Sequence, residues 1–251
     1  MPPYRIFRLK LALFGGSALL AACSGESQAW NYEVMGVHAR SFVSDTAQRY
    51  AGFIEQDQSV DVSLHEWERW EPGEIVENLR TNEDLRQAIA EAEVITYDFA
   101  FDWQNRSQNL YLTGLCGGGD NQDCLREDLQ QAQQDWSAIL ELIAELRAGS
   151  PVLLRVLLHG DWFFEYPFWS PTPEQKGVMS DYYHQLQTFA QEDARRRGVP
   201  VVLVFPEPFF NDTTPPPGYL QSDGIRLTEE GSRVVAELLR ETGYEFEVLG
   251  E

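Results

Sequence analysis

The stretch Val152-Leu153-Leu154-Arg155-Val156-Leu157-Leu158 decides the fold of this 251-residue chain. A short and almost continuous apolar run of this kind is typical of a strand that is buried on both faces of a sheet. Four more short runs, either apolar or alternating, predict strands at residues 32–35, 60–64, 94–99 and 199–205. The fold is therefore expected to be organised around five strands.

Segments of helical periodicity separate these runs at residues 46–55, 82–92, 125–148 and 176–197, and a last one covers residues 228–242. The expected N-caps are Thr81 and Thr228, and the expected helix ends are Gly149, Gly198 and Gly243. Because strands and helices alternate, the sequence predicts one three-layer α/β domain. Its central five-stranded parallel sheet would be covered by helices on both faces.

The composition is that of a globular protein, with 43% hydrophobic and 24% charged residues. The charge is strongly acidic, because 19 Lys+Arg stand against 40 Asp+Glu and give a formal net charge of -21. An acidic chain repels phosphate backbones, so we expect no nucleic-acid partner.

The N-terminus has the pattern of an export signal. Arg5, Arg8 and Lys10 precede an apolar run over residues 11–22, which is shorter than the roughly 20 residues that a membrane-spanning helix needs. We therefore expect residues 1–22 to be a signal peptide, residues 23–30 an anchor and short tether, and residues 31–251 the folded domain.

The end of this signal, Leu20-Ala21-Ala22-Cys23, resembles the bacterial lipobox. The resemblance implies that Cys23 is lipidated and becomes the first residue of an exported, extracytoplasmic lipoprotein held at a membrane. The alternative is a plain secretory signal that is followed by an incidental cysteine. Residues 1–22 hold three basic and no acidic residues, so the mature chain would carry 16 Lys+Arg against 40 Asp+Glu, a formal charge of -24.

The other two cysteines, Cys116 and Cys124, flank a glycine-rich segment of seven residues. Disulfides persist in exported proteins, so we predict a Cys116–Cys124 bridge. A metal site is the alternative, but two thiols without a nearby histidine supply only half of a ligand set.

Ligands of open α/β sheets bind beyond the carboxyl ends of the strands. The segments at those positions resemble the SGNH/GDSL hydrolase family of bacterial lipases and esterases, which has a flavodoxin-like fold. The matching blocks are Tyr32-Glu33-Val34-Met35-Gly36-Val37-His38, residues 94–103 and residues 223–231, and residues 116–126 look like an insertion of one branch of the family. The resemblance covers nearly the whole mature chain.

The catalytic positions implied by this resemblance are mostly replaced. The family's nucleophilic serine falls on His38, its oxyanion asparagine on Asp102 and its general-base histidine on Arg226, while its oxyanion glycine falls near Arg69 or Trp70. Asp223 alone keeps the identity of its counterpart, the triad acid.

These replacements remove the ordinary chemistry of the family. Arg226 has no acceptor for a hydroxyl proton, and a carboxylate at Asp102 would repel a developing oxyanion unless it stayed protonated. Loss of a triad nucleophile or base alone lowers turnover about a millionfold in subtilisin. The sequence therefore predicts a pseudoenzyme.

A rebuilt site is the alternative. His38 could act as a base on water, oriented by Asp223 or Asp102, and Arg226 could hold an anionic substrate or pair with Asp223. A shifted alignment would make Ser41 the nucleophile, still without a base before the last helix. His38 can also be a loop histidine without chemistry.

The remaining histidines and aromatic residues leave further alternatives. His159 follows the fourth strand and could join His38 and a carboxylate in a metal site, whereas His65 and His184 are expected to be structural. Six aromatic residues in 161–170 and three more in 205–210 either line an apolar or carbohydrate-binding cleft or fill it. The run Arg195-Arg196-Arg197 is expected to complement a helix dipole.

Together these features predict a membrane-anchored extracytoplasmic lipoprotein that serves as a binding or scaffold module. Its ligand at the remodelled cleft would be a small molecule, a glycan or a protein, and no cofactor or metal is expected. The alternative is a divergent ester or glycan-ester hydrolase that uses His38 or Ser41 with Asp223.

Overall fold

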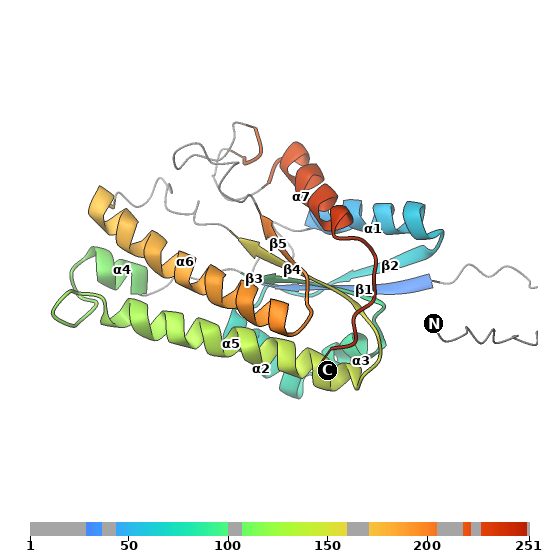
Figure 1. Cartoon of the computed structure of the whole chain (residues 1–251), viewed down its shortest axis with the longest axis horizontal. Coiled ribbons are helices and arrows are strands. Elements are labelled where there is room, and N and C mark those ends of the chain that lie inside the picture. Colours follow the sequence, from blue (N-terminus) through green and yellow to red (C-terminus); the bar gives the residue numbers. More distant parts are fainter. Residues whose placement is uncertain are drawn as a thin grey trace, which may run out of the picture.

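A five-stranded parallel sheet lies at the centre of the molecule (Figure 1). The computed structural model describes residues 29–36, 44–99, 107–159, 171–204, 218–221 and 227–249. The strands are β1 (Ala29–Gly36), β2 (Asp61–Glu66), β3 (Val94–Phe99), β4 (Leu153–His159) and β5 (Val201–Val204), in the order β2-β1-β3-β4-β5. Every neighbouring pair is parallel, which confirms the predicted sheet.

Helices cover both faces of this sheet, as Figure 1 shows. On one face lie α1 (Ser44–Gln58) and α7 (Glu229–Glu241); on the other lie α2 (Pro72–Thr81), α3 (Glu83–Glu91), α5 (Asp123–Arg147) and α6 (Pro173–Arg196). The short α4 (Ser107–Leu112) packs against α5. The predicted three-layer α/β class is confirmed.

β3 and β4 are buried along their whole length because each contributes side chains to two separate cores. In β3, Ile95, Tyr97 and Phe99 belong to the core beneath α2, α3, α5 and α6, whereas Val94 belongs to the core beneath α1 and α7. Phe99 packs edge-on against Trp136 of α5, with ring centroids 5.0 Å apart. This two-sided burial explains why β3 and β4 read as nearly continuous apolar runs.

The bounds of β2 and β4 differ from the prediction by one or two residues, and larger differences occur at the starts of β1 and β5. β1 begins at Ala29, which pairs with Asp61 of β2, so the sheet already includes the last two residues that were expected to form the tether. β5 begins at Val201 and not at residue 199. Pro200 has no N–H to give to a ladder, and only its carbonyl takes part, as acceptor from Val156.

The predicted N-cap at Thr81 is wrong. Thr81 is the last residue of α2, and its hydroxyl donates to the carbonyl of Glu77 over 2.9 Å. Asn82 caps α3 instead, because its side-chain oxygen accepts from the Leu85 N–H at 3.2 Å. The predicted cap at Thr228 is confirmed.

Two helices, α2 and α4, were not predicted. Pro72 occupies the first turn of α2, and Glu71 and Glu74 form a capping box at its start. The other helix ends agree with the prediction, since Gly149, Gly198 and Gly243 follow α5, α6 and α7 with φ of 80°, 69° and 79°.

The C-terminal segment crosses the amino end of the sheet, on the side where β1 begins (Figure 1). Glu247 forms an antiparallel bridge with Val152, just before β4. The Arg155 guanidinium, buried on β4, donates to Glu247 Oε1 at 2.8 Å and to the Gly243 carbonyl at 2.9 Å. Across the part of the chain described, no helix is both long enough and apolar enough to span a bilayer.

Candidate functional site

The carboxyl ends of the parallel strands meet at one edge of the sheet, which we call the carboxyl edge. β1, β3, β4 and β5 end there at Gly36, Phe99, His159 and Val204. This is the edge at which ligands bind in open α/β folds.

Gly36 allows β1 and β3 to approach each other closely at this edge. It has a φ of 152°, and a Cβ at this position would overlap the backbone carbonyl and the Cβ of Asp98. Only glycine fits without a shift of one of the two strands.

Two buried ionisable side chains form a pair at the carboxyl edge. The His159 Nε2 forms a hydrogen bond with Asp98 Oδ1, and both side chains are fully inaccessible to solvent. Burying a carboxylate or an imidazolium is costly unless the group is paired. The Asp98–His159 pair therefore ties β3 to β4 at the point where both strands end.

The strand register explains why these two residues meet. Asp98 lies opposite Leu157, and His159 is two residues further along β4, so it points to the same face of the sheet. That face is the one covered by α1 and α7, to which Leu157 contributes. The His159 backbone is held from α6, where the Gln187 side chain donates to its carbonyl over 2.9 Å.

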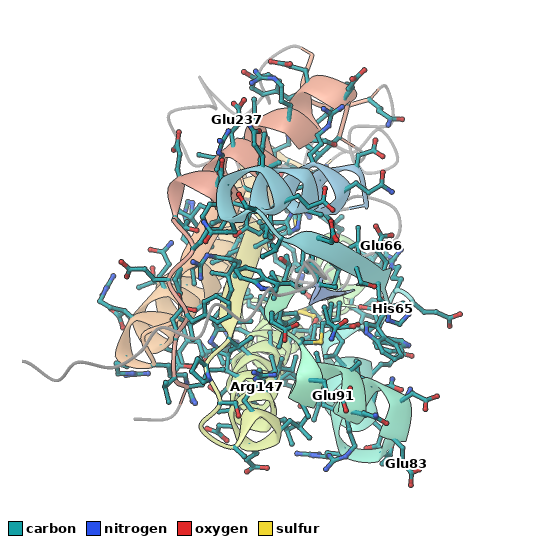
Figure 2. All side chains as sticks on the ribbon, turned by 90° about the vertical axis from the view of Figure 1, so that its right-hand side faces the viewer. His65, Glu66, Glu83, Glu91, Arg147 and Glu237 are labelled. Atoms are coloured by element: carbon teal, nitrogen blue, oxygen red, sulfur yellow. A yellow bond between two sulfur atoms is a disulfide. The ribbon has the colours of Figure 1, made fainter. Side chains whose placement is uncertain are left out.

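A second cluster lies beside the end of β2. The carboxylate of Glu33 is buried and its Oε2 accepts from Trp67 Nε1 at 2.7 Å and is 3.0 Å from His65 Nδ1. The rings of Trp67 and Trp70 are stacked with centroids 5.9 Å apart. Figure 2 shows His65 on the edge strand of the sheet.

The family's oxyanion glycine was expected near Arg69 or Trp70, which lie beside this cluster. The Trp70 N–H donates to the Gly36 carbonyl over 3.4 Å, and Arg69 forms an ion pair with Glu71 at 3.6 Å. This side of the site therefore presents half-buried indole rings, which offer contact area and few rotatable bonds to a ligand.

The replaced catalytic positions His38, Ser41, Asp102, Asp223 and Arg226 lie outside the described residues, as does the lipidation candidate Cys23. Described elements flank three of these positions. His38 follows β1 by two residues, Asp102 follows β3 by three, and Arg226 directly precedes Leu227.

Several contacts fix the backbone at the start of α7. Leu227 is buried and bridges Leu220, and the Thr228 hydroxyl accepts from the Gly231 N–H at 3.1 Å. A Cβ at Gly231 would overlap the Tyr219 carbonyl, so the helix packs tightly on the preceding segment. The segment that contains Asp223 and Arg226 is thus bounded on both sides by fixed backbone.

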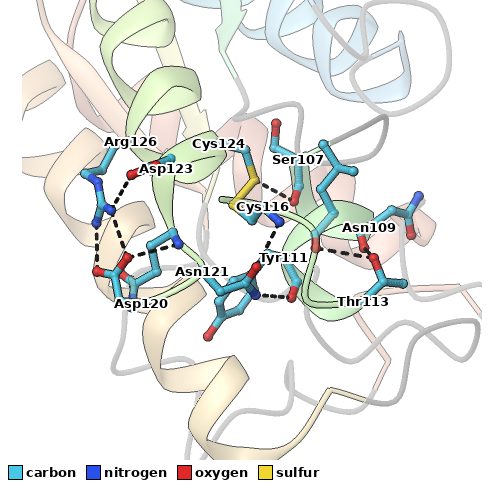
Figure 3. The surroundings of a disulfide bond; sticks show 12 residues. Ser107, Asn109, Tyr111, Thr113, Cys116, Asp120, Asn121, Asp123, Cys124 and Arg126 are labelled. Carbon is cyan, nitrogen blue, oxygen red and sulfur yellow. Dashed lines mark hydrogen bonds and ion pairs between the residues drawn. A yellow bond between two sulfur atoms is a disulfide. The ribbon is translucent and has the colours of Figure 1, made fainter. Parts of the chain in front are cut away.

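The predicted Cys116–Cys124 disulfide is confirmed (Figure 3). Asn121 organises the loop that it closes, because its side chain accepts from the Cys116 N–H and donates to the Tyr111 carbonyl, each at 2.8 Å. The alternative of a metal bound by the two thiols is wrong, since both sulfurs are bonded to each other.

Among the described residues no group of three or more His, Cys, Asp or Glu side chains could hold a metal ion. His159, considered above as a ligand together with His38, is paired with Asp98, while His38 lies outside the described residues. The other two histidines lie where expected, His65 on β2 beside Glu33 and His184 within α6.

The Asp98–His159 pair was not predicted. A signal for it exists in the sequence, because Asp98 is the one ionisable carboxylate in the otherwise apolar or neutral run of β3 and a buried charge requires a partner. His159 ends the neighbouring strand and satisfies that requirement.

Comparisons with known proteins agree with this architecture. No family model and no curated protein matches the sequence. Among solved structures, the lipase Lip_vut3 from a goat rumen metagenome superposes with a TM-score of 0.64 at 20% identity, over 86% of this chain and 98% of that one.

Two further lipases are similar at lower identity. An extracellular lipase from Streptomyces rimosus has a TM-score of 0.54 at 10% identity, over 84% of this chain and 99% of that one. A putative GDSL-like lipase from Parabacteroides merdae has a TM-score of 0.54 at 12% identity, over 87% of this chain and 98% of that one. The chain therefore has the fold of the SGNH/GDSL hydrolases.

Proposed function

We propose that this protein is an exported, lipid-anchored binding module with an SGNH/GDSL hydrolase fold and without the Ser–His–Asp chemistry of that fold. The remodelled carboxyl edge would hold its ligand, which is a small molecule, a glycan or a protein. The anchor would be Cys23, and residues 1–22 would be removed on export.

The observation that carries this proposal is the pairing of His159 with Asp98. A histidine that acts as a general base must place a ring nitrogen within hydrogen-bond reach of the proton that it removes. His159 ends β4 at the carboxyl edge, but its side chain is fully buried and its Nε2 is bonded to Asp98. Its other ring nitrogen, Nδ1, is also inaccessible to solvent, so we infer that this imidazole supports the packing of the edge and does not reach a substrate.

The sequence supports the same conclusion at the catalytic positions. The serine position holds His38, and the histidine position holds Arg226, which stays protonated and cannot accept a proton. Asp223 remains, but a triad acid acts by orienting a histidine, and the base position that it would orient holds an arginine. Removal of both nucleophile and base leaves no route for ordinary ester hydrolysis.

The aromatic character of the edge supports binding. Trp67 and Trp70 are half-buried and stacked beside the end of β1, and Glu33 fixes the indole of Trp67. Rings that are held in place lose little entropy when they pack against a ligand. A preformed surface of this kind suits recognition without turnover.

The test is an activity assay of the mature chain on short acyl nitrophenyl esters and on acetylated glycans, beside an Asp223→Ala variant. We expect equal background rates for both proteins, because the retained acid has no base to orient. Turnover in the wild type that disappears in Asp223→Ala would contradict the proposal.

That contradictory result would support the second candidate function, a divergent ester or glycan-ester hydrolase. It is favoured by the retained Asp223 and by the hydrolase fold. Variants His38→Ala and Ser41→Ala would then identify the group that replaces the family's nucleophile, because only one of them should remove the remaining activity.

The anchor is tested separately. Cells that produce the full chain are fed an alkyne fatty acid, and the recovered protein is conjugated to a fluorophore. We expect labelling of the wild type and none of a Cys23→Ser variant, which still exports through the same signal. Equal labelling of both proteins would reject Cys23 as the lipidated residue.

A further inference from the structure

The end of the sheet opposite the site, which we call the amino edge, lies close to the anchor that we propose at Cys23. β1 begins there at Ala29, and five residues separate Ala29 from Cys23. Six Cα–Cα steps span at most about 20 Å even when fully extended. If the proposed anchor is correct, the amino edge is held within that distance of the lipid surface.

Exposed apolar side chains gather at this edge. Phe246 and Val248 are 38% and 39% exposed, and their segment is fixed to the sheet by the two backbone hydrogen bonds between Glu247 and Val152. Phe246 packs edge-on against Trp30 of β1, with centroids 5.2 Å apart. Phe246 is therefore held next to the first residues of β1, and Val248 lies two residues further along the same segment.

The remaining exposed large apolar side chain in the described part of the chain is distant from this edge. Leu115, 70% exposed, lies in the loop between α4 and α5. Figure 1 shows that loop at the end of the molecule opposite the start of β1 and the C-terminal segment. Leu115 is thus a natural control for any effect of exposed apolar surface in general.

Two arginines also lie at the amino edge, which holds acidic side chains as well, such as Glu245 and Glu247 of the C-terminal segment. Arg195 and Arg196 are exposed in the last turn of α6, shortly before β5 begins. Arg196 forms an ion pair with Asp193 and still keeps 67% of its side chain exposed. Guanidinium groups in this position can bind phosphate oxygens.

We propose that Phe246, Val248, Arg195 and Arg196 form a surface that rests on the phospholipid headgroups around the anchor. The two apolar side chains enter the headgroup region and the two arginines bind lipid phosphates. The carboxyl edge then faces away from the membrane, toward a ligand in the extracytoplasmic space. This inference rests on the proposed lipid anchor and adds the orientation of the domain.

The test uses the lipidated protein, reconstituted in vesicles of phosphatidylcholine with a minor fraction of phosphatidylglycerol. Phe246→Cys, Val248→Cys and Leu115→Cys variants are each labelled with an environment-sensitive fluorophore. The introduced thiol is the reactive one, because Cys116 and Cys124 are bonded to each other and Cys23 carries the lipid. Lipids with a nitroxide near the headgroup then quench any label that reaches them.

We expect quenching at positions 246 and 248 to be at least about twofold stronger than at position 115, because side chains at an interface enter the headgroup region. Phe246→Cys removes the contact with Trp30 and can disturb folding. Glu245→Cys keeps that contact, and its label should be quenched as strongly as we expect for a label at position 246. Flotation with the vesicles shows that the protein is attached to them. If the attached protein is quenched equally at positions 246, 248 and 115, the proposed orientation is wrong but the anchor is not. Protein that does not float would overturn both the anchor and the orientation.

The arginines are tested with a matched pair of charge variants on the same helix. Arg195→Gln should weaken quenching at position 248, whereas Lys176→Gln, about 28 Å away along α6, should not change it. Equal effects of the two variants would show that only the total charge matters and would remove the arginines from the proposed surface.

Discussion

Each end of the sheet has one buried, titratable or charged side chain of β4: Arg155 at the amino edge and His159 at the carboxyl edge. Both side chains lie on the same face of the sheet. Arg155 lies in the first half of the strand and His159 at its last position, and both are inaccessible to solvent. Arg155 donates to Glu247, to the Thr242 hydroxyl and to the carbonyls of Leu154 and Gly243. It therefore fastens the C-terminal segment to the centre of the fold.

At the carboxyl edge, the described contact joins two neighbouring strands. His159 bonds to Asp98 on the adjacent strand and joins two elements that are already paired through the sheet. Removal of this pair should loosen the edge locally, whereas removal of Arg155 should release a whole segment. From these contacts we expect a larger loss of stability from changes at the amino edge than from changes at the carboxyl edge.

The largest effect is expected from Arg155→Met. The change leaves the Glu247 carboxylate, a hydroxyl and two carbonyls without their donor, and breaking a buried ion pair destabilises a protein by about 3–5 kcal/mol. Urea unfolding of the mature domain, followed by circular dichroism, measures the loss. A loss below that of Asp98→Asn would reverse the ranking of the two ends.

The second largest loss of stability is expected from removal of the Cys116–Cys124 disulfide. Replacing Cys116 and Cys124 by serine removes a crosslink over a short loop, which is worth about 2–3 kcal/mol in the chain-entropy model. The same urea titration, run beside reduced wild-type protein, checks the value. Reduced wild type and the double variant should unfold together, and a difference between them would mean that the serines disturb the loop by themselves.

Asp98→Asn is expected to cost about 2 kcal/mol, because it keeps the shape of the side chain but weakens a hydrogen bond between groups that can both be charged. His159→Gln should have a similar effect. In a double-mutant cycle the two losses should not add, since each change removes the same interaction. Additive losses would mean that the two residues stabilise the edge independently.

The last prediction concerns pH and the Arg155 region, where a change in stability appears only above pH 10. Burial raises the pKa of Tyr50 to about 12, while the nearby Arg155 opposes the shift. In the unfolded chain Tyr50 loses its proton near pH 10, whereas in the folded protein it keeps the proton up to about pH 12. The stability that this shift contributes is therefore fully present below pH 10 and is lost between pH 10 and 12.

A Tyr50→Phe variant isolates this contribution. Its urea midpoint should fall less steeply than that of the wild type between pH 10 and 12, and some decline should remain because burial also raises the pKa of Tyr32. Parallel curves for the two proteins would show that Tyr50 is not the group that titrates.

The sequence was informative where structure follows from local pattern. The bounds of β3 were predicted to the residue, because a strand buried on both faces is apolar or uncharged along nearly its whole length. α2 was missed because glutamates, not serine or threonine, form its capping box at Glu71 and Glu74. The same omission misplaced the cap of α3, since Thr81 belongs to the helix that was not predicted.

The candidate site was only partly predictable. The replacements at His38, Asp102 and Arg226 could be read directly from the sequence. The Asp98–His159 pair could not, because it depends on the register of two strands whose partners are 61 residues apart. Register depends on how the apolar pattern of each strand packs against its neighbours, so it cannot be read from one strand before the fold is known.

The central claim, that this hydrolase fold lacks an activated nucleophile, is tested most directly by covalent trapping with a fluorophosphonate. The reagent reports an activated serine whatever the natural substrate is, and intact mass spectrometry detects the adduct. We predict no adduct on the mature chain under conditions that label an active GDSL lipase completely. An adduct that is lost in a Ser41→Ala variant would contradict the account and identify Ser41 as a working nucleophile.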